Sequence, residues 1–275
     1  MSVSKLDNLY PAFIESQDNL DNKDIGAMVM TCANIPLNKH ISALKLQSRL
    51  DRIQGLPLTE SQIEYLKLIG FNDAFIDLMS NWPIMPSVST SDEVSVRIEG
   101  TYSEAILWQA PVNMIVREMY FANIMAVNEI DVNVLMLEAT RRFQSKGDML
   151  RNCGLRFIEG GSDYRYRFDW YSLLFGMIMG DFSDVFLGTT NVGMAMSHGM
   201  TPYRSDYPSI SSPTTKQLEF ALEKDQNVLV RDASAFQMAH LYSHFGDSIS
   251  LEWGSDLVAD MGLLGSNLDI KWMNI

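Results

Sequence analysis

Cysteine and long apolar runs are both scarce in this 275-residue chain. Its two cysteines, Cys32 and Cys153, cannot form the disulfide framework of a small secreted protein, so we expect a reducing compartment. The most apolar stretch, LLFGMIMG at residues 173–180, is far shorter than the roughly 20 residues that a membrane-spanning helix needs. The N-terminus lacks the basic start and apolar block of a signal peptide. These absences predict a cytoplasmic protein.

Positive charge is also in short supply. The chain has 21 Lys and Arg residues against 34 Asp and Glu residues, which gives a formal net charge of −13. Such a chain repels phosphate backbones and anionic lipid surfaces, so we expect neither a nucleic-acid partner nor a membrane partner. Hydrophobic residues make up 47% of the chain, which is typical of a globular protein with a sizeable core.

Familiar catalytic motifs are missing as well. The sequence contains no G-x-S-x-G elbow, no P-loop and no dinucleotide-binding fingerprint. His240 and His244 are spaced for one helix face, as two metal ligands would be, but the glutamate of the zinc-protease motif does not follow His240. We therefore predict no metal site and assign no catalytic residue.

The front half of the chain combines helices with a strand. Residues 1–50 are polar with scattered acids and predict a solvated loop or a short helix start. Thr59 and Gln62 form a capping-box pattern before an amphipathic helix. EVSVRIEG alternates as a half-buried strand does, and residues 103–126 and 131–146 predict helices. Pro111 should break or kink the first of these two helices.

The back half alternates short apolar strands with helical stretches, which favours a mostly parallel sheet or barrel. The expected strands are LRFIEG at 155–160, VFLG at 185–188, NVLVRD at 227–232 and ISLEWG at 249–254. The Ser- and Pro-rich segment at 205–216 predicts a loop. We expect an α/β protein in which a mixed α+β N-terminal domain (1–150) packs on a truncated, irregular α/β barrel-like domain (151–275).

Three small polar turns follow strands of the back half, at the sheet end where α/β folds place ligands. Glycines, hydroxyls, arginines and free helix amides at such turns can bind phosphate. The candidate phosphate-binding residues are Gly161, Ser162, Arg165, Arg167, Gly188, Thr189, Thr190, Asn191, Gly254 and Ser255. Taken alone, the GTTN turn at 188–191 is more typical of a simple helix cap than of an anion site, because caps are commoner.

These segments, in this order, resemble the nicotinate phosphoribosyltransferase family. VSVRIEGTYSEAILWQAPVNMIVREM at 94–119 resembles the family's strand, Gly-x-x-x-Glu turn and I-L-W-E-x-P-L helix. FIEGGSDYRYRF resembles its F-G-T-R-R-R segment, and FLGTTNVGMAMSHGMTP at 186–202 resembles its F-V-G-T-S-N-x-x-L-A segment. The resemblance implies a type II phosphoribosyltransferase fold, transfer from phosphoribosyl pyrophosphate to nicotinate with Mg²⁺, and a homodimer.

The chain departs from the family pattern at the residues that carry the chemistry. Pro208 stands where the resemblance places the catalytic histidine, and Asp163 and Tyr164 replace two arginines. Roughly sixty to seventy residues of the family's barrel have no counterpart between Ser212 and Val228, more than a trimmed loop explains.

Two principal hypotheses follow. In the first, the chain is a catalytically inactive relative that acts as a structural or protein-interaction module, as a homodimer or with a protein partner and without a cofactor. In the second, it is an active phosphoribosyltransferase or nucleotide-binding enzyme with a rebuilt site, in which His198 or His240 replaces the lost histidine and Mg²⁺ is retained. Further candidates for that rebuilt site are Arg204, Asp206 and Asp232. An acidic decoy of another protein is a third reading, although the acids are scattered rather than patterned.

Overall fold

The computed structural model describes residues 5–8, 25–31, 40–82, 84–89, 95–160, 168–203, 209–211, 213–225, 227–231, 235–253 and 269–274. The elements of the first half are η1 (Lys5–Asn8), β1 (Ile25–Thr31), α2 (Ala43–Gln54), α3 (Glu60–Leu68), α4 (Asp73–Asn81), β2 (Ser87–Ser89), β3 (Ser95–Thr101), α5 (Tyr102–Ile106), α6 (Gln109–Val127) and α7 (Val132–Asn152). Those of the second half are β4 (Phe157–Glu159), α8 (Phe168–Asp181), β5 (Phe186–Thr189), α9 (Val192–Ser197), β6 (Ser209–Ser211), α10 (Thr215–Leu222), β7 (Val228–Arg231), α11 (Ala235–Phe245), η5 (Gly246–Ser248), β8 (Ile249–Trp253) and β9 (Asp269–Asn274).

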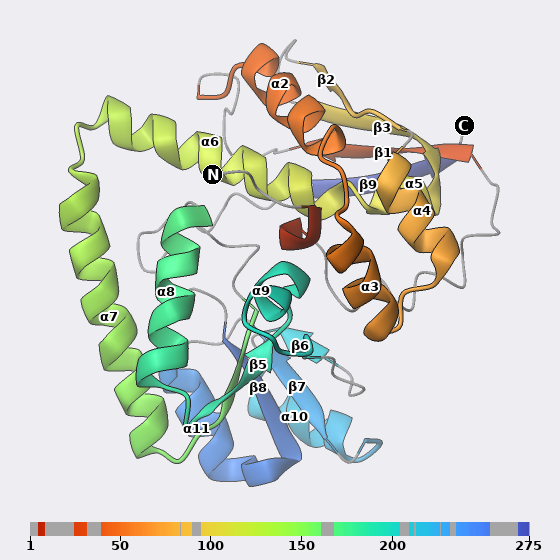
Figure 1. Ribbon diagram of the computed structural model, residues 1–275. Helices are drawn as coiled ribbons and strands as arrows, with labels where there is room; N and C mark the ends of the chain where they lie inside the picture. Colours follow the sequence, from red (N-terminus) through yellow and green to blue (C-terminus); the bar gives the residue numbers. More distant parts are fainter. Residues whose placement is uncertain are drawn as a thin grey trace.

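A four-stranded antiparallel sheet in the order β2-β3-β1-β9 forms one end of the molecule (Figure 1). In β3, Val96 and Ile98 are buried while Glu99 is exposed, so the alternation predicted for this strand is confirmed. The prediction of a loop or short helix start for residues 1–50 is wrong in part, because Ile25–Thr31 is β1 and lies in the interior of this sheet.

A second sheet, in the order β5-β4-β8-β7-β6, has only parallel strand pairs. This confirms the expected strand–helix alternation and the mostly parallel sheet. The loop prediction for 205–216 needs correction, because Ser209–Ser211 pairs with β7 as strand β6 and α10 begins at Thr215. Together the two sheets and their helices give the mixed, α/β fold that the sequence predicts.

Several helix boundaries follow directly from local sequence. Thr59 and Gln62 form the predicted capping box at the start of α3, and Thr101 with Glu104 forms another at the start of α5. The predicted interruption in 103–126 falls at the break between α5 and α6. Pro111 lies just after this break, in the first turn of α6, where a missing N–H removes no helical hydrogen bond.

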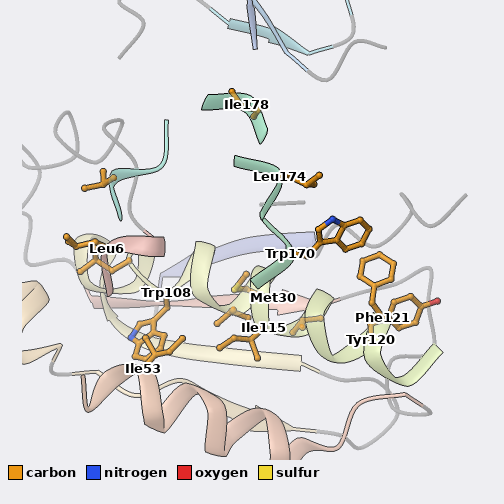
Figure 2. Close-up of a cluster of buried hydrophobic side chains, with 14 of the residues drawn as sticks. Leu6, Met30, Ile53, Trp108, Ile115, Tyr120, Phe121, Trp170, Leu174 and Ile178 are labelled. Carbon is orange, nitrogen blue, oxygen red and sulfur yellow. The ribbon is translucent and has the colours of Figure 1, made fainter. Parts of the chain in front are cut away.

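One apolar core runs through both halves of the chain (Figure 2). It includes Ile115 and Phe121 of α6 together with Trp170 and Ile178 of α8. The division of the chain into two domains near residue 150 stays a prediction. Strand β9, which lies after residue 150 in the sequence, pairs with β1 in the antiparallel sheet formed by the first half of the chain. Within the described residues, no helix combines the length and the apolar character needed to cross a bilayer.

A buried lysine fixes the N-terminal element η1. The Nζ of Lys5 donates to the carbonyl oxygens of Met79 (2.8 Å) and Ser80 (3.1 Å) at the end of α4 and lies 5.3 Å from the centre of the Trp82 ring. Burial lowers the pKa of this ammonium group. The residues of η1 also contact α9. Helix α4 is therefore connected through η1 to α9, the helix that follows β5 of the parallel sheet (Figure 1).

Candidate functional site

The three predicted turns begin at neighbouring strand ends. Strand β4 lies between β5 and β8, and Glu159 at its end is in register with Thr189 of β5 and Trp253 of β8. Because these strands are parallel, the segments that follow them leave the sheet at the same edge. The structure therefore brings together the starting points of all three turns, as the sequence predicts.

Many of the predicted site residues lie outside the described part of the chain. These are Gly161, Ser162, Asp163, Tyr164, Arg165, Arg167, Arg204, Asp206, Pro208, Asp232, Gly254 and Ser255. Their roles stay predictions. The described part of the site is the end of β4, the end of β5 and the start of α9.

A buried carboxylate organises this edge of the sheet. Glu159 is only 5% exposed, and its Oε2 accepts hydrogen bonds from the Tyr171 phenol and from the Thr189 hydroxyl, each at 2.7 Å. A buried carboxylate needs such donors, because desolvation without hydrogen bonds is strongly unfavourable. Sequence reasoning missed both Glu159 and Tyr171. The available signal was a glutamate in a short apolar strand, because a buried carboxyl group needs hydrogen-bond partners.

The GTTN turn folds around the same glutamate. The Thr190 amide donates to the Glu159 carbonyl oxygen (2.9 Å), and the Asn191 amide donates to the Thr189 hydroxyl (3.0 Å). The Asn191 side chain in turn caps α9 by accepting from the Met194 amide at 2.8 Å. Glu159, Thr189, Thr190 and Asn191 are buried, and the Thr189 hydroxyl and the Thr190 and Asn191 backbone amides donate within the protein. The helix-cap interpretation therefore fits the observed geometry, and phosphate binding here stays a prediction.

Gly188 adopts a backbone conformation that favours glycine. Its φ is +154°, which side-chain-bearing residues rarely adopt, whereas an added Cβ would make only an ordinary van der Waals contact, 3.4 Å from the Cβ of Tyr203. The Tyr203 amide donates to the Thr189 carbonyl oxygen at 2.7 Å. The segment after α9 is thus fixed against the end of β5.

The histidines proposed as substitutes lie elsewhere. His198 is the C-cap of α9, at the opposite end of that helix from Asn191, and its Nδ1 is 3.0 Å from the Met194 carbonyl oxygen. His240 and His244 share an exposed face of α11 with their rings 5.2 Å apart. Across the described residues, no cluster of three or more His, Cys, Asp or Glu side chains is arranged to hold a metal ion.

Comparison with known proteins shows which proteins the chain resembles. No family model matches the chain. Over 169 residues it is 28% identical to the nicotinate phosphoribosyltransferase of Ralstonia nicotianae, a match that covers 60% of this chain and 40% of that protein. The chain is thus similar to the nicotinate phosphoribosyltransferases.

Two further nicotinate phosphoribosyltransferases are similar to the chain, one in sequence and one in fold. The nicotinate phosphoribosyltransferase of Chromohalobacter salexigens is 25% identical over 164 residues, which cover 58% of this chain and 41% of that one. The crystal structure of the nicotinate phosphoribosyltransferase from Porphyromonas gingivalis superposes with a TM-score of 0.77 at 14% identity, covering 100% of this chain and 90% of that chain. The sequence alignment with the Ralstonia nicotianae protein spans only 40% of that relative's length. This nicotinate phosphoribosyltransferase-like chain therefore has the fold of those enzymes, while its sequence aligns with less than half of the length of the Ralstonia nicotianae relative.

Proposed function

We propose that this nicotinate phosphoribosyltransferase-like protein does not carry out phosphoribosyl transfer and acts as a structural or protein-binding module. The observation that carries the proposal is the bonding of the GTTN turn. The Thr189 hydroxyl donates to the Glu159 side chain, the Asn191 amide donates to that hydroxyl, and the Thr190 amide donates to the Glu159 carbonyl oxygen. A phosphate group needs such donors to be free and directed outward.

Net charge supports the same proposal. The chain carries a formal net charge of −13, which repels the pyrophosphate group of phosphoribosyl pyrophosphate.

The sequence supplies independent support. Pro208 cannot accept a proton or carry a phosphate at the position where the resemblance places a histidine. Under this proposal the chain requires no cofactor, and Mg²⁺ would bind only together with phosphoribosyl pyrophosphate.

A turnover assay tests the proposal. The purified chain is incubated with nicotinate, phosphoribosyl pyrophosphate and Mg²⁺, and nicotinate mononucleotide is measured by chromatography beside the Ralstonia nicotianae relative as a control. We expect product from the control alone. Product from this chain that is lost in Asn191→Ala but kept in Asn191→Ser would instead support the active enzyme with a rebuilt site, because serine preserves the helix cap.

A further inference from the structure

Methionine side chains and aromatic rings form a second, smaller cluster beside the main apolar core. Tyr171 and Phe175 of α8 and Met194 of α9 are its buried centre, and Met179 and Met200 are among the partly buried residues packed against them. Helices α8 and α9, which are neighbours in Figure 1, meet in this cluster. Methionine commonly fills space in a core, so the cluster by itself indicates only packing.

The turn at the end of α9 places a histidine beside this cluster. His198 is the C-cap of the helix, and Gly199 follows it with a φ of +65°. The Met200 amide then donates back to the Ala195 carbonyl oxygen at 2.9 Å, as in a Schellman turn. The Tyr65 phenol donates to the Met200 carbonyl oxygen at 2.7 Å. The backbone of Met200 is therefore held from two sides.

The His198 ring is oriented as a metal ligand would be. Its centre lies 4.7 Å from the centre of the Phe175 ring, so the imidazole borders the methionine cluster. Its Nδ1 lies 3.0 Å from the Met194 carbonyl oxygen, which can only accept, so in the neutral ring Nδ1 carries the hydrogen and Nε2 keeps a lone pair. His198 is exposed, and within the described residues Nε2 has no hydrogen-bond partner. Metal-binding histidines typically donate one ring N–H to a carbonyl and bind the ion with the other nitrogen.

We propose that the Nε2 of His198 and the thioether sulfurs of Met194 and Met200 bind a Cu(I) ion at the exposed end of α9. Thioether ligands are soft and select Cu(I), and imidazole is also a good copper ligand. This inference departs from the expectation, drawn from the sequence, that the chain binds no metal. It is independent of the proposed function, because Cu(I) binding requires neither phosphate nor turnover.

Two other groups on the chain could compete for copper. His240 and His244 lie on an exposed face of α11 with their rings 5.2 Å apart, and a pair of imidazoles suits divalent Cu²⁺, Ni²⁺ and Zn²⁺. Cys153 has an exposed free thiol, which is a soft ligand by itself. Met196 provides a matched control within α9, because its side chain packs against the main core and not against the second cluster.

An anaerobic competition titration tests the proposal. Cu(I), kept reduced with ascorbate, is added to the purified full chain and bicinchoninate, whose coloured complex reports the copper that the protein leaves unbound. We expect one Cu(I) ion per chain. Met200→Leu and His198→Asn should each weaken binding by more than about tenfold, because each removes one ligand. Leucine keeps the apolar volume, and asparagine can still donate to the Met194 carbonyl oxygen.

The controls separate this site from its competitors. Met196→Leu, Cys153→Ser and His244→Ala should all leave the Cu(I) affinity unchanged. A wild-type chain that binds no Cu(I) would overturn the proposal. Binding that survives both Met200→Leu and His198→Asn, or that Cys153→Ser abolishes, would also overturn it, since the ion would then bind elsewhere.

NMR spectra of the chain labelled at its methionine methyl groups give a second readout. Ag(I) serves as the probe, because it is soft like Cu(I) and is not oxidised during the measurement. We expect Ag(I) to shift the methyl signals of Met194 and Met200 and to leave that of Met196 in place. Unchanged signals for Met194 and Met200 at saturating Ag(I) would contradict the assigned ligands. The same spectra show whether each variant is folded.

Discussion

The hydroxyl of Thr189 donates a 2.7 Å hydrogen bond to the carboxylate of Glu159, although 30 residues separate them in the chain. This bond connects the ends of β4 and β5 at the edge of the parallel sheet. It also turns a residue of the GTTN segment toward the protein interior. The conformation of the GTTN turn therefore depends on a side chain outside the segment.

Removing that hydroxyl should destabilise the protein. Thr189→Val keeps the side-chain shape but leaves the buried Glu159 carboxylate with one donor fewer. We expect the free energy of unfolding to fall by roughly 1–3 kcal/mol, measured by urea denaturation. Thr189→Ser keeps the hydroxyl and should lose less. A Thr189→Val protein as stable as the wild type would show that Glu159 does not depend on this bond.

Tyr65 should make stability depend on pH in the alkaline range. Its phenol donates to the Met200 carbonyl oxygen at 2.7 Å, and burial raises its pKa to about 12 from an ordinary 10.0. Since the folded pKa exceeds the unfolded one, the stabilisation is complete below pH 10.0 and is lost as pH rises towards 12. The difference in unfolding free energy between wild type and Tyr65→Phe should shrink across this range.

The same pair of proteins gives a neutral-pH reference. Tyr65→Phe removes one partly buried hydrogen bond and should lose about 1 kcal/mol. If the difference between the two proteins stays constant through the alkaline range, the phenol does not titrate as its environment indicates.

Gly147 lies where α7 meets the ring of Phe182. A Cβ at this position would overlap the ring, so Gly147→Ala should reduce the free energy of unfolding by about 1–3 kcal/mol. Gly176→Ala on α8 is the matched control. A Cβ there meets nothing within 4 Å, and we expect stabilisation by roughly 0.5–1 kcal/mol from helix propensity. Thermal unfolding that moves both variants in the same direction would contradict this account of the contact.

Glu129 adopts a strained backbone conformation. Its φ is +52°, in the left-handed region that favours glycine, at the end of α6. Glu129→Gly should stabilise the chain by about 1 kcal/mol. Glu129→Ala removes the charge without relieving the strain, so it should leave the stability nearly unchanged. Equal stability of the glycine and alanine variants in urea denaturation would argue against strain at this position.

Local sequence was sufficient to predict much of the fold. The capping box at Thr59 and the alternation of β3 are short-range signals, and both are confirmed. Strand β1 was missed because IGAMVMT has no alternation and is stabilised by pairing with β3 and with β9, at the far end of the chain. Strand β6 was missed because a Ser-rich edge strand of three residues looks like a loop until β7 is beside it.

Only the location of the candidate site was predicted from the sequence. Strand–helix alternation was enough to expect the turns after β4, β5 and β8 at one edge, since parallel strands end together. The bonding of the turn was beyond sequence reasoning, because it depends on Glu159 and Tyr171, which no motif connects to GTTN. Which way a threonine hydroxyl points is decided by such long-range partners.

The most direct test of the central claim is isothermal titration of the purified chain with phosphoribosyl pyrophosphate and Mg²⁺, followed by nicotinate. If the edge formed by Glu159 and the GTTN turn is closed, as we propose, the titration gives no binding heat. Micromolar binding that Asn191→Ala abolishes and Asn191→Ser preserves would contradict the account, because it would place a working phosphate site at this turn.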